Sequence, residues 1–451
     1  MAGGTFIAQN KVRPGAYINF KAVSAPAISV GARGVAAMPL ATGWGANYIE
    51  LYSTELQNGK SIAKVGCSFV DEEALLYRLI LANTYKLLIA RTDVEGGRKA
   101  AATIGDLKAE ARYVGAVGNR LSIIVARVGE TAFYDVTTAL DGIGKDTQRV
   151  DAISKLVSND WVVFSDVAEE PPGSFTVSAG MPLTNGANGT ETSASIGEAI
   201  ALLATKQFNV LGCMSEEAAV KSLVVSTIKQ LRENEGRKCK AVLYNAAGLA
   251  GTDYEGIISS KQGYRTQDGD ITAKQFIAQL TGMAAGANLG VSLTHKTIQG
   301  AVEVLGDPLT HDDIVEALKS GWLVLSQMND GTIVVEQDIN SLCNDLTDKD
   351  DSFRKNLIIN TLDEIGNTIL NTWDKTYCGK VHNNATQREN YKAALVKYFK
   401  QLEAMELIQE FDKDADIIIE QGENLDSVVV NWWVKPVDVM EKLYMTTYVR
   451  R

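Results

Sequence analysis

The tripeptide Gly59-Lys60-Ser61 has the residue types that end a phosphate-binding loop. Such a loop needs another glycine five residues before Gly59, so that main-chain amides can surround a phosphate, and Thr54 occupies that position. Gly43 and Gly45 could begin a dinucleotide-binding turn, but the third glycine of that pattern is absent. Neither segment therefore predicts a nucleotide site.

Histidines and acidic clusters are the other residues that could do chemistry. The chain has neither a Gly-x-Ser-x-Gly nucleophile turn nor a His-Glu-x-x-His zinc motif. None of the histidines has a partner at metal-ligand spacing: His295, His311 and His382. One acidic cluster lacks the glycine and distal glutamate of a calcium loop, and we expect a solvated linker or, alternatively, a docking point for a basic patch: Asp345, Asp348, Asp350 and Asp351. We expect no catalytic residue, no metal site and no cofactor.

The cysteines are odd in number, widely spaced and without a Cys-x-x-Cys pair: Cys67, Cys213, Cys239, Cys343 and Cys378. This pattern favours neither a disulfide framework nor a zinc ribbon. We expect five packing residues in a reducing compartment.

The composition is that of a folded protein with several domains. The length of 451 residues predicts about three domains, and 45% hydrophobic residues exclude overall disorder. No apolar stretch approaches the ~18 residues of a membrane-spanning helix, and the N-terminus lacks the apolar core of a secretory signal. The net charge of −11 argues against non-specific binding of nucleic acids, which requires clustered positive charge.

Charge is distributed unevenly along the chain. The first 49 residues hold four basic side chains and no acidic one, whereas residues 336–451 hold 14 basic and 21 acidic side chains. The last two residues, Arg450 and Arg451, are again basic. Either chance on solvated surfaces explains this pattern, or basic terminal arms dock on acidic domains of other copies, because complementary charges steer association.

Both chain ends have the composition of short strands. Residues 16–20 follow Pro14-Gly15 and, like residues 443–450, are rich in aromatic and β-branched side chains. A terminal strand can close the sheet of its own subunit or add to the edge of a neighbour's sheet. The sequence leaves both alternatives open.

The interior of the chain divides by pattern into three regions. Alternating strand and helix signals on both sides of residues 96–184 predict an α/β layer. Between Glu95 and Met181, short strands punctuated by Gly and Pro turns predict an inserted β-sandwich. After residue 336, two long helical patterns over 353–373 and 387–405 precede strands at 416–420 and 427–434, which predicts an α+β domain.

Seven segments taken together resemble the contractile phage tail sheath proteins, especially those of Gram-positive phages, prophage-like elements and R-type bacteriocins. The resemblance rests on residues 3–20 (beginning Gly-Gly-Thr-Phe), 111–121, 183–190, 336–342, 353–356, 379–383 and 437–444. No single segment is diagnostic, but their order and spacing extend over essentially the whole chain.

The resemblance implies the fold and the domain limits. We expect an α/β sheath domain with an inserted β-sandwich, a C-terminal α+β domain and extended strand arms at both ends. The expected limits are residues 1–22 for the N-terminal arm, 23–95 and 185–335 for the sheath domain, 96–184 for the sandwich, 336–440 for the inner domain facing the tube, and 441–451 for the C-terminal arm.

The resemblance also implies a structural function and no enzymatic activity. Sheath subunits stack as helical rings around an inner tail tube, and the family expectation is sixfold symmetry. The stack is built in a metastable extended state that contracts on a signal from the baseplate. The implied partners are other copies, the tube protein, and baseplate and tail terminator proteins, in a virion or tail-like particle assembled in the bacterial cytoplasm. The alternatives are another self-assembling tail part, such as a tube or baseplate protein, and an enzyme of unknown type.

Strand exchange between subunits defines the predicted site. We expect the arm strands that one subunit donates to another to contain Tyr17, Ile18, Phe20, Tyr444, Tyr448 and Val449. We expect the recipient strands to include Ile417, Ile419, Val428 and Val430. The alternative for each arm aromatic is packing within its own subunit.

Overall fold

The computed structural model describes residues 3–4, 16–17, 33–344 and 348–450. The chain forms two compact units. One unit contains residues 32–366 and 438–451, and the other contains residues 367–437 together with the N-terminal residues.

A six-stranded sheet is the centre of the larger unit. Its order is β15 (Ile257–Ser260), β14 (Lys240–Tyr244), β13 (Val210–Cys213), β3 (Val35–Leu40), β5 (Lys86–Arg91) and β4 (Tyr48–Tyr52). All neighbours are parallel except β4, which is antiparallel to β5. The strands β3, β5, β13 and β14 are near-continuous buried runs, as parallel strands buried on both faces require, whereas the edge strand β4 alternates.

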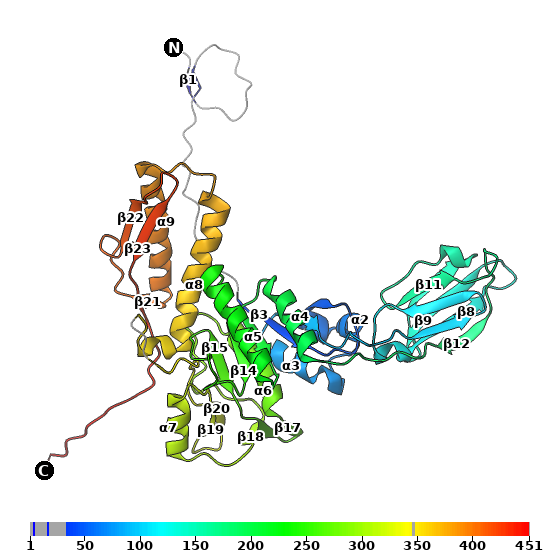
Figure 1. Ribbon diagram of the computed structural model, residues 1–451, viewed down its shortest axis with the longest axis horizontal. Helices are drawn as coiled ribbons and strands as arrows, with labels where there is room; N and C mark the ends of the chain where they lie inside the picture. Colours follow the sequence, from blue (N-terminus) through cyan, green and yellow to red (C-terminus); the bar gives the residue numbers. More distant parts are fainter. Residues whose placement is uncertain (1–2, 5–15, 18–32, 345–347, 451) are drawn as a thin grey trace. The chain divides into compact units, whose positions relative to one another are not determined.

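Helices cover both faces of this sheet (Figure 1). On one face α3 (Leu75–Leu81) and α6 (Ala273–Gly286) bury Ile80 and Phe276. On the other face α4 (Ser193–Ala204) and α5 (Ala218–Lys229) bury Ile200 and Val224. The α/β layer predicted from the sequence is therefore present, although β4 and the short helices α1 (Ser53–Gln57) and α2 (Ser61–Val65) were not predicted.

Smaller elements extend the larger unit after α6. They are the antiparallel sheet of β16 (Tyr264–Thr266), β17 (Gly269–Ile271) and β18 (Ala301–Val304), the helix α7 (His311–Lys319), and the hairpin of β19 (Leu325–Gln327) and β20 (Ile333–Val335). The Thr310 hydroxyl accepts a hydrogen bond from the Asp313 amide and caps α7. The hairpin strands are antiparallel and are joined by a turn at Asp330.

The inserted domain is a β-sandwich. One sheet has the order β10 (Ile143–Val150), β9 (Tyr134–Leu140), β8 (Leu121–Arg127) and β12 (Ser178–Pro182). The other has the order β11 (Val162–Asp166), β7 (Leu107–Ala111) and β6 (Ala101–Ile104). Alternate residues of β7 and β8 point into the shared core, which gives their sequences a period of two.

The structure corrects the predicted strands of the sandwich in two places. The apolar run at residues 175–177 predicts a strand, but it forms only an isolated bridge between Phe175 and Gly105, and the strand begins at Ser178. The strand β10 was not predicted, since it is polar and mostly exposed and pairs with β9 through its main chain.

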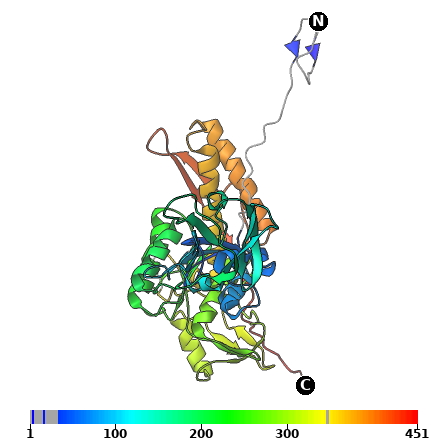
Figure 2. The same ribbon diagram turned by 90° about the vertical axis from the view of Figure 1, so that its right-hand side faces the viewer.

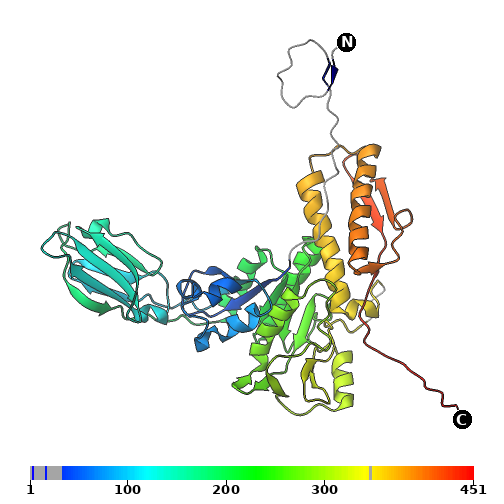
Figure 3. The same cartoon turned by 180° about the vertical axis from the view of Figure 1, so that it is seen from behind.

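The C-terminal unit consists of helices and a hairpin. The helix α8 (Asn356–Thr372) contains the division between the two units and continues into a wide helical turn at Trp373–Tyr377. The helix α9 (Ala385–Ala404) lies beside the antiparallel hairpin of β22 (Ile417–Gln421) and β23 (Val428–Trp432) (Figure 3). A short pair, β21 (Ile408–Gln409) with β24 (Lys435–Pro436), closes the unit.

The two chain ends differ from their predicted strands. The strands β1 (Gly3–Gly4) and β2 (Ala16–Tyr17) form a parallel pair near the N-terminus (Figure 2), whereas residues 18–20 lie outside the described residues. Residues 439–450 form neither helix nor strand, so the predicted strand at 443–450 is not present in the chain by itself.

Candidate assembly site

The hairpin of β22 and β23 presents unpaired main-chain groups along both outer edges. The Trp433 amide donates to the Asp416 carbonyl at 3.0 Å, and the Gly422 amide donates to the Ser427 carbonyl at 3.0 Å. Because hydrogen-bonded pairs alternate with non-bonded pairs in an antiparallel ladder, every second residue turns its N–H and C=O away from the partner strand. These outward residues include all four predicted recipients: Ile417, Ile419, Val428 and Val430.

No other segment of the described chain hydrogen-bonds to these outward groups. The side chains of the same residues point toward α9 and are buried or half-buried. The intervening residues face outward, and Ile418 and Val429 are 42% and 44% exposed. The hairpin is therefore a sheet with one face covered and both edges open, which is the geometry that accepts added strands.

Polar contacts hold the turn of this hairpin against α9. The side-chain amide of Asn383 donates to the carbonyls of Leu425 and Ser427, each at 2.8 Å. Arg388 donates to the Asn383 side-chain oxygen at 2.7 Å and fixes the orientation of that amide. The sequence pattern did not identify this brace, since only the fold brings residue 383 to the turn at 425–427.

The hairpin and its flanks are acidic. Residues 412–426 contain six carboxylates and one lysine: Asp412, Asp414, Asp416, Glu420, Glu423 and Asp426, with Lys413. This concentration gives a basic terminal segment an attractive surface, and salt screens such an attraction.

The C-terminal segment leaves large apolar side chains in solvent. Tyr444, Tyr448 and Val449 are 89%, 87% and 88% exposed, and Leu443 and Met445 are exposed as well. The alternative of packing within its own subunit is therefore not what the structure contains for these residues. Contiguous exposed apolar side chains of this kind are typical of interaction surfaces.

Glu441 anchors the base of this segment. Its carboxylate forms an ion pair with Lys355 and accepts hydrogen bonds from Gln337 Nε2 and Thr294 Oγ1, both at 2.7 Å. Burial opposes ionisation of Glu441, but the hydrogen bonds from Lys355, Gln337 and Thr294 outweigh it and lower its pKa. The carboxylate therefore stays charged and fixes the point from which residues 442–450 extend.

The N-terminal residues of the predicted site are only partly described. Tyr17 lies in β2, where it pairs with Gly4. Ile18 and Phe20 lie outside the described residues.

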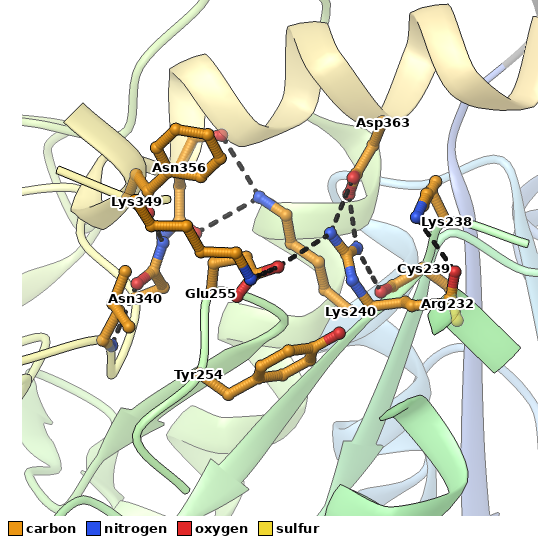
Figure 4. A network of polar contacts seen from close by, with 12 residues as sticks. Arg232, Lys238, Cys239, Lys240, Tyr254, Glu255, Asn340, Lys349, Asn356 and Asp363 are labelled. Atoms are coloured by element: carbon orange, nitrogen blue, oxygen red, sulfur yellow. Dashed lines mark hydrogen bonds and ion pairs between the residues drawn. The ribbon is translucent and has the colours of Figure 1, made fainter. Parts of the chain in front are cut away.

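A buried network of ion pairs attaches the first turns of α8 to the six-stranded sheet (Figure 4). Arg232 donates to both carboxylate oxygens of Asp363, at 2.7 and 2.8 Å, and to the Cys239 carbonyl at 2.8 Å. Glu255 lies 3.9 Å from Arg232 and accepts a hydrogen bond from Lys349 at 2.8 Å. Breaking such a buried pair leaves an uncompensated charge, which is strongly destabilising.

Lys240 is the second cation of this network. Its ammonium donates to the main-chain and side-chain oxygens of Asn356, both at 3.2 Å. Asn356 in turn donates to the buried carboxylate of Asp338 at 2.9 Å. Burial lowers the pKa of Lys240 to about 7, although Asp363 and Asp338 act in the opposite direction.

The Gly59-Lys60-Ser61 segment and the acidic cluster make contacts that stabilise local structure. Lys60 precedes the short helix α2, and the Ser61 hydroxyl donates to the Cys67 carbonyl at 3.0 Å. Asp350 accepts from the Ser352 amide at the start of a short helical turn, whereas Asp345 lies outside the described residues. Among the residues described, no group of three or more His, Cys, Asp or Glu is placed to hold a metal ion.

The histidines and cysteines lie in separate parts of the fold. His295 and His311 lie in a turn and at the start of α7, and His382 lines a cavity in the C-terminal unit. Cys67, Cys213 and Cys239 are buried, as predicted for packing residues, and burial raises the pKa of the Cys67 and Cys239 thiols to about 12. Cys378 is exposed, so the prediction of packing is wrong for this residue.

Comparison with known proteins identifies the family. Residues 95–188 match the phage tail sheath protein beta-sandwich domain, residues 189–341 its central domain, and residues 348–450 the phage tail sheath C-terminal domain. The chain is 33% identical over 475 aligned positions to the phage-like element PBSX protein XkdK of Bacillus subtilis (strain 168), with 100% of both chains covered. The chain belongs to the phage tail sheath family.

Solved structures agree with this assignment. The sheath tail protein from Desulfitobacterium hafniense is 33% identical, with a TM-score of 0.81 over 96% of this chain and 99% of that one. The helical sheath protein of the anti-feeding prophage in its contracted state has the same fold at 10% identity, with a TM-score of 0.57 over 97% of this chain and 99% of that one.

A tail sheath protein of contractile injection systems is a structural component of phage or phage-like particles and not an enzyme. This chain has the multi-domain mixed α/β architecture of the family, with β-sandwich, central and C-terminal sheath domains. Its described helices include none with the length and apolarity needed to cross a membrane.

Proposed function

We propose that this chain is the subunit of a contractile tail sheath that polymerises as a helical tube around an inner tail tube. The observation that carries the proposal is the combination of a hairpin with two open edges and a C-terminal segment with exposed apolar side chains. Each feature is incomplete in one chain, and a strand donated by a second copy completes both.

The proposed contact is strand addition at the hairpin. The N-terminal arm donates Tyr17, Ile18 and Phe20, and the C-terminal arm donates the segment around Tyr444 and Tyr448. The recipient edges are β22, with Ile417 and Ile419, and β23, with Val428 and Val430. Because donor and recipient surfaces differ, the contact is heterologous, and such a contact can continue from copy to copy along an open helix. The sixfold symmetry of the stacked rings is the part of the proposal that comes from the family.

The sheath is proposed to assemble in an extended, metastable state. On a signal from the baseplate, the subunits rotate into a packing of lower free energy and drive the tube through the bacterial envelope. Main-chain hydrogen bonds at the strand joints keep neighbouring subunits connected during the rotation. The difference in free energy between two packings drives this motion, so the mechanism requires no nucleotide.

The domains have distinct proposed roles. Residues 336–440 form the inner domain that faces the tube, residues 1–22 and 441–451 form the arms, and the sandwich at 96–184 is an insertion in the α/β domain at 23–95 and 185–335. The remaining proposed partners are the baseplate and tail terminator proteins. Assembly takes place in the bacterial cytoplasm and yields a virion or a tail-like particle.

Electron microscopy of the purified full-length chain in negative stain tests this proposal. We expect hollow, striated tubes, either from the chain alone or after co-expression with the tube protein of the same gene cluster. The matched control lacks residues 1–20 and should yield folded subunits without long tubes. Small closed oligomers under both conditions, or long tubes from the truncated chain, would contradict the proposal.

Ionic strength provides a second test of the same contact. The arms are basic and the hairpin is acidic, so added salt should screen their attraction and raise the protein concentration needed for tube formation. Tube formation that is independent of salt between about 0.05 and 0.5 M would count against a charge-guided arm contact.

A further inference from the structure

A cavity of about 390 Å³ lies in the C-terminal unit, between the start of α9 and the hairpin. Its walls include the rings of Trp373, Tyr377 and Tyr391, together with Val428 of β23. The Tyr377 and Tyr391 ring centroids are 4.5 Å apart, and that of Trp373 lies 5.9 and 5.5 Å from them. An aromatic cavity of this size has room for one more ring.

A buried polar atom in the wall of this cavity has no partner. The Tyr377 side chain is only 8% exposed, and its hydroxyl makes no hydrogen bond within the described chain. Burying a hydroxyl without a partner is costly. An occupant that brings a hydrogen-bonding group to Tyr377 would remove that cost.

The position of Val428 relates the cavity to the β23 edge. The side chain of Val428 lines the cavity, and its main-chain groups point outward along the open edge. Because paired residues of neighbouring strands point to the same face, a strand added to this edge places alternate side chains on the cavity side.

We propose that the cavity receives the side chain of Tyr448 from a second copy of this chain. This inference rests on the proposed strand addition and names the contact that fixes its register. Tyr444, Tyr448 and Arg450 share one face of an extended segment, whereas Leu443, Met445 and Val449 share the other. With the tyrosines on the cavity side, the aliphatic residues lie on the outward face beside the exposed Val429.

The anchor at Glu441 distinguishes between the two tyrosines. An extended chain spans about 3.3–3.6 Å per residue, so Tyr444 reaches only about 10 Å from the anchor and Tyr448 about 24 Å. Only the longer tether lets the ring enter another copy while the intervening residues pair along its edge. The tyrosine hydroxyl supplies the group that Tyr377 lacks, and the ring adds the area of an aromatic anchor.

Charge supports the same occupant. Asp426 lines the cavity, and so does Arg388, which donates to the side chains of Asn383 and Gln421. Arg450 follows Tyr448 by two residues and lies on the same face of the segment. The Arg450 guanidinium therefore complements the Asp426 carboxylate in the cavity wall.

Disulfide trapping between two different chains tests this contact, because the exposed Cys378 also lines the cavity. The donor chain carries Tyr448→Cys and Cys378→Ser, and the acceptor is the natural chain. After co-assembly and mild oxidation we expect a cross-linked dimer in which peptide mapping joins position 448 to Cys378. The matched donor with Tyr444→Cys and Cys378→Ser should yield at least about fivefold less of the bond to Cys378, because a disulfide requires Cα atoms within about 7 Å.

A second probe retains the aromatic ring. Natural chains are co-assembled with chains that carry p-azidophenylalanine at position 448, and illumination should join this residue to residues 373–391 or 426–428 of another chain. Adducts elsewhere, adducts within one chain, or equal trapping from position 444 would overturn the inference. If tubes form but the adducts map elsewhere, strand addition stands without this register, whereas failure of the natural chain to form tubes contradicts the proposed function itself.

Discussion

The edge strand β15 of the six-stranded sheet and the edges of the β22–β23 hairpin differ in whether the same chain covers them. The outer edge of β15 is covered by later segments of the same chain, because the Ile257 and Ser259 carbonyls accept from the Ser341 and Leu323 amides at 2.8 and 2.9 Å. The edges of the β22–β23 hairpin have no such cover in the described chain, although their main-chain groups are just as polar.

The difference separates the sheet that the chain itself completes from the hairpin that, in the proposed sheath, a second copy completes. The six-stranded sheet is covered by helices on both faces, and its central strands are largely apolar. A two-stranded hairpin is only marginally stable in water, and here one helix and the Asn383 brace support it. We therefore expect changes at the sheet to affect folding and changes at the hairpin to affect polymerisation.

Removing residues 442–451 is expected to have the largest effect. It deletes the exposed apolar side chains of the arm but keeps the Glu441 anchor. Burying each of these side chains contributes about 1.5–3 kcal/mol, so the concentration needed for polymerisation should rise at least about 100-fold. Sedimentation measures this change, and an unchanged melting curve shows that the subunit still folds. Normal tubes from the shortened chain would remove the C-terminal arm from the account.

Asp363→Ala tests the buried ion pair beside the six-stranded sheet. It leaves Arg232 buried without its bidentate partner, so we expect the free energy of unfolding to fall by about 3–5 kcal/mol. Chemical denaturation measures this loss. The double variant Arg232→Met with Asp363→Leu should lose less, because it removes the buried charge together with its partner. Equal losses in the single and double variants would show that the ion pair itself is not the cause.

Val430→Pro tests the open edge of β23. It removes an outward N–H that the hairpin does not use, so the subunit should fold, whereas strand addition at β23 should weaken at least about tenfold. The matched control is Val429→Pro, which removes an inward N–H and should destabilise the hairpin itself. Comparing polymerisation with thermal unfolding separates the two effects. Unimpaired assembly of a folded Val430→Pro chain would exclude the β23 edge as the recipient.

Lys240→Met tests whether the stability of the folded sheet depends on pH through the buried Lys240. Below pH 7 natural Lys240 is protonated in both the folded and the unfolded state. Between about 7 and its ordinary pKa of 10.5 only the unfolded state holds the proton, so the free energy of unfolding rises with pH. Relative to Lys240→Met, the natural chain should gain at most about 1.4 kcal/mol per pH unit in this interval. A difference that stays flat from pH 7 to 9 would show that Lys240 is not titrating inside the fold.

Glu441→Gln is expected to have the smallest effect. It weakens the contact with Lys355 and loosens the base of the arm, so polymerisation should require about two- to fivefold more protein at neutral pH. Because the pKa of Glu441 is lowered, its contribution is complete above the ordinary pKa of glutamate and is lost as pH falls through the lowered value. The natural chain and the variant should therefore converge in acid. A constant difference between them at all pH values would argue against this ionisation.

Much of the fold could be predicted from the sequence because it depends on local patterns. The continuous apolar runs of β3 and β5 and the capped start of α7 each contain their own signal. The strand β10 has no such signal, since its exposed polar residues are held only by pairing with β9. The ion pair between Arg232 and Asp363 joins residues far apart in the sequence, and no local pattern predicts it.

The candidate site was predictable only in outline. Strand composition pointed to Ile417, Ile419, Val428 and Val430, but their outward main-chain groups follow from the register of the hairpin. The terminal segment around Tyr448 reads as a strand, yet it has no partner strand in the described chain. Its pairing remains a prediction about a second copy.

Residue-resolved hydrogen exchange of the β23 amides, in free subunits and in assembled tubes, tests the central claim most directly. We expect the outward amides of Val428 and Val430 to exchange rapidly in the free chain and at least about tenfold more slowly in tubes, because a donated strand then accepts their hydrogen bonds. The inward amides of Val429 and Asn431 should already exchange slowly in the free chain. Equal exchange of the outward amides in both states would contradict strand addition at this edge.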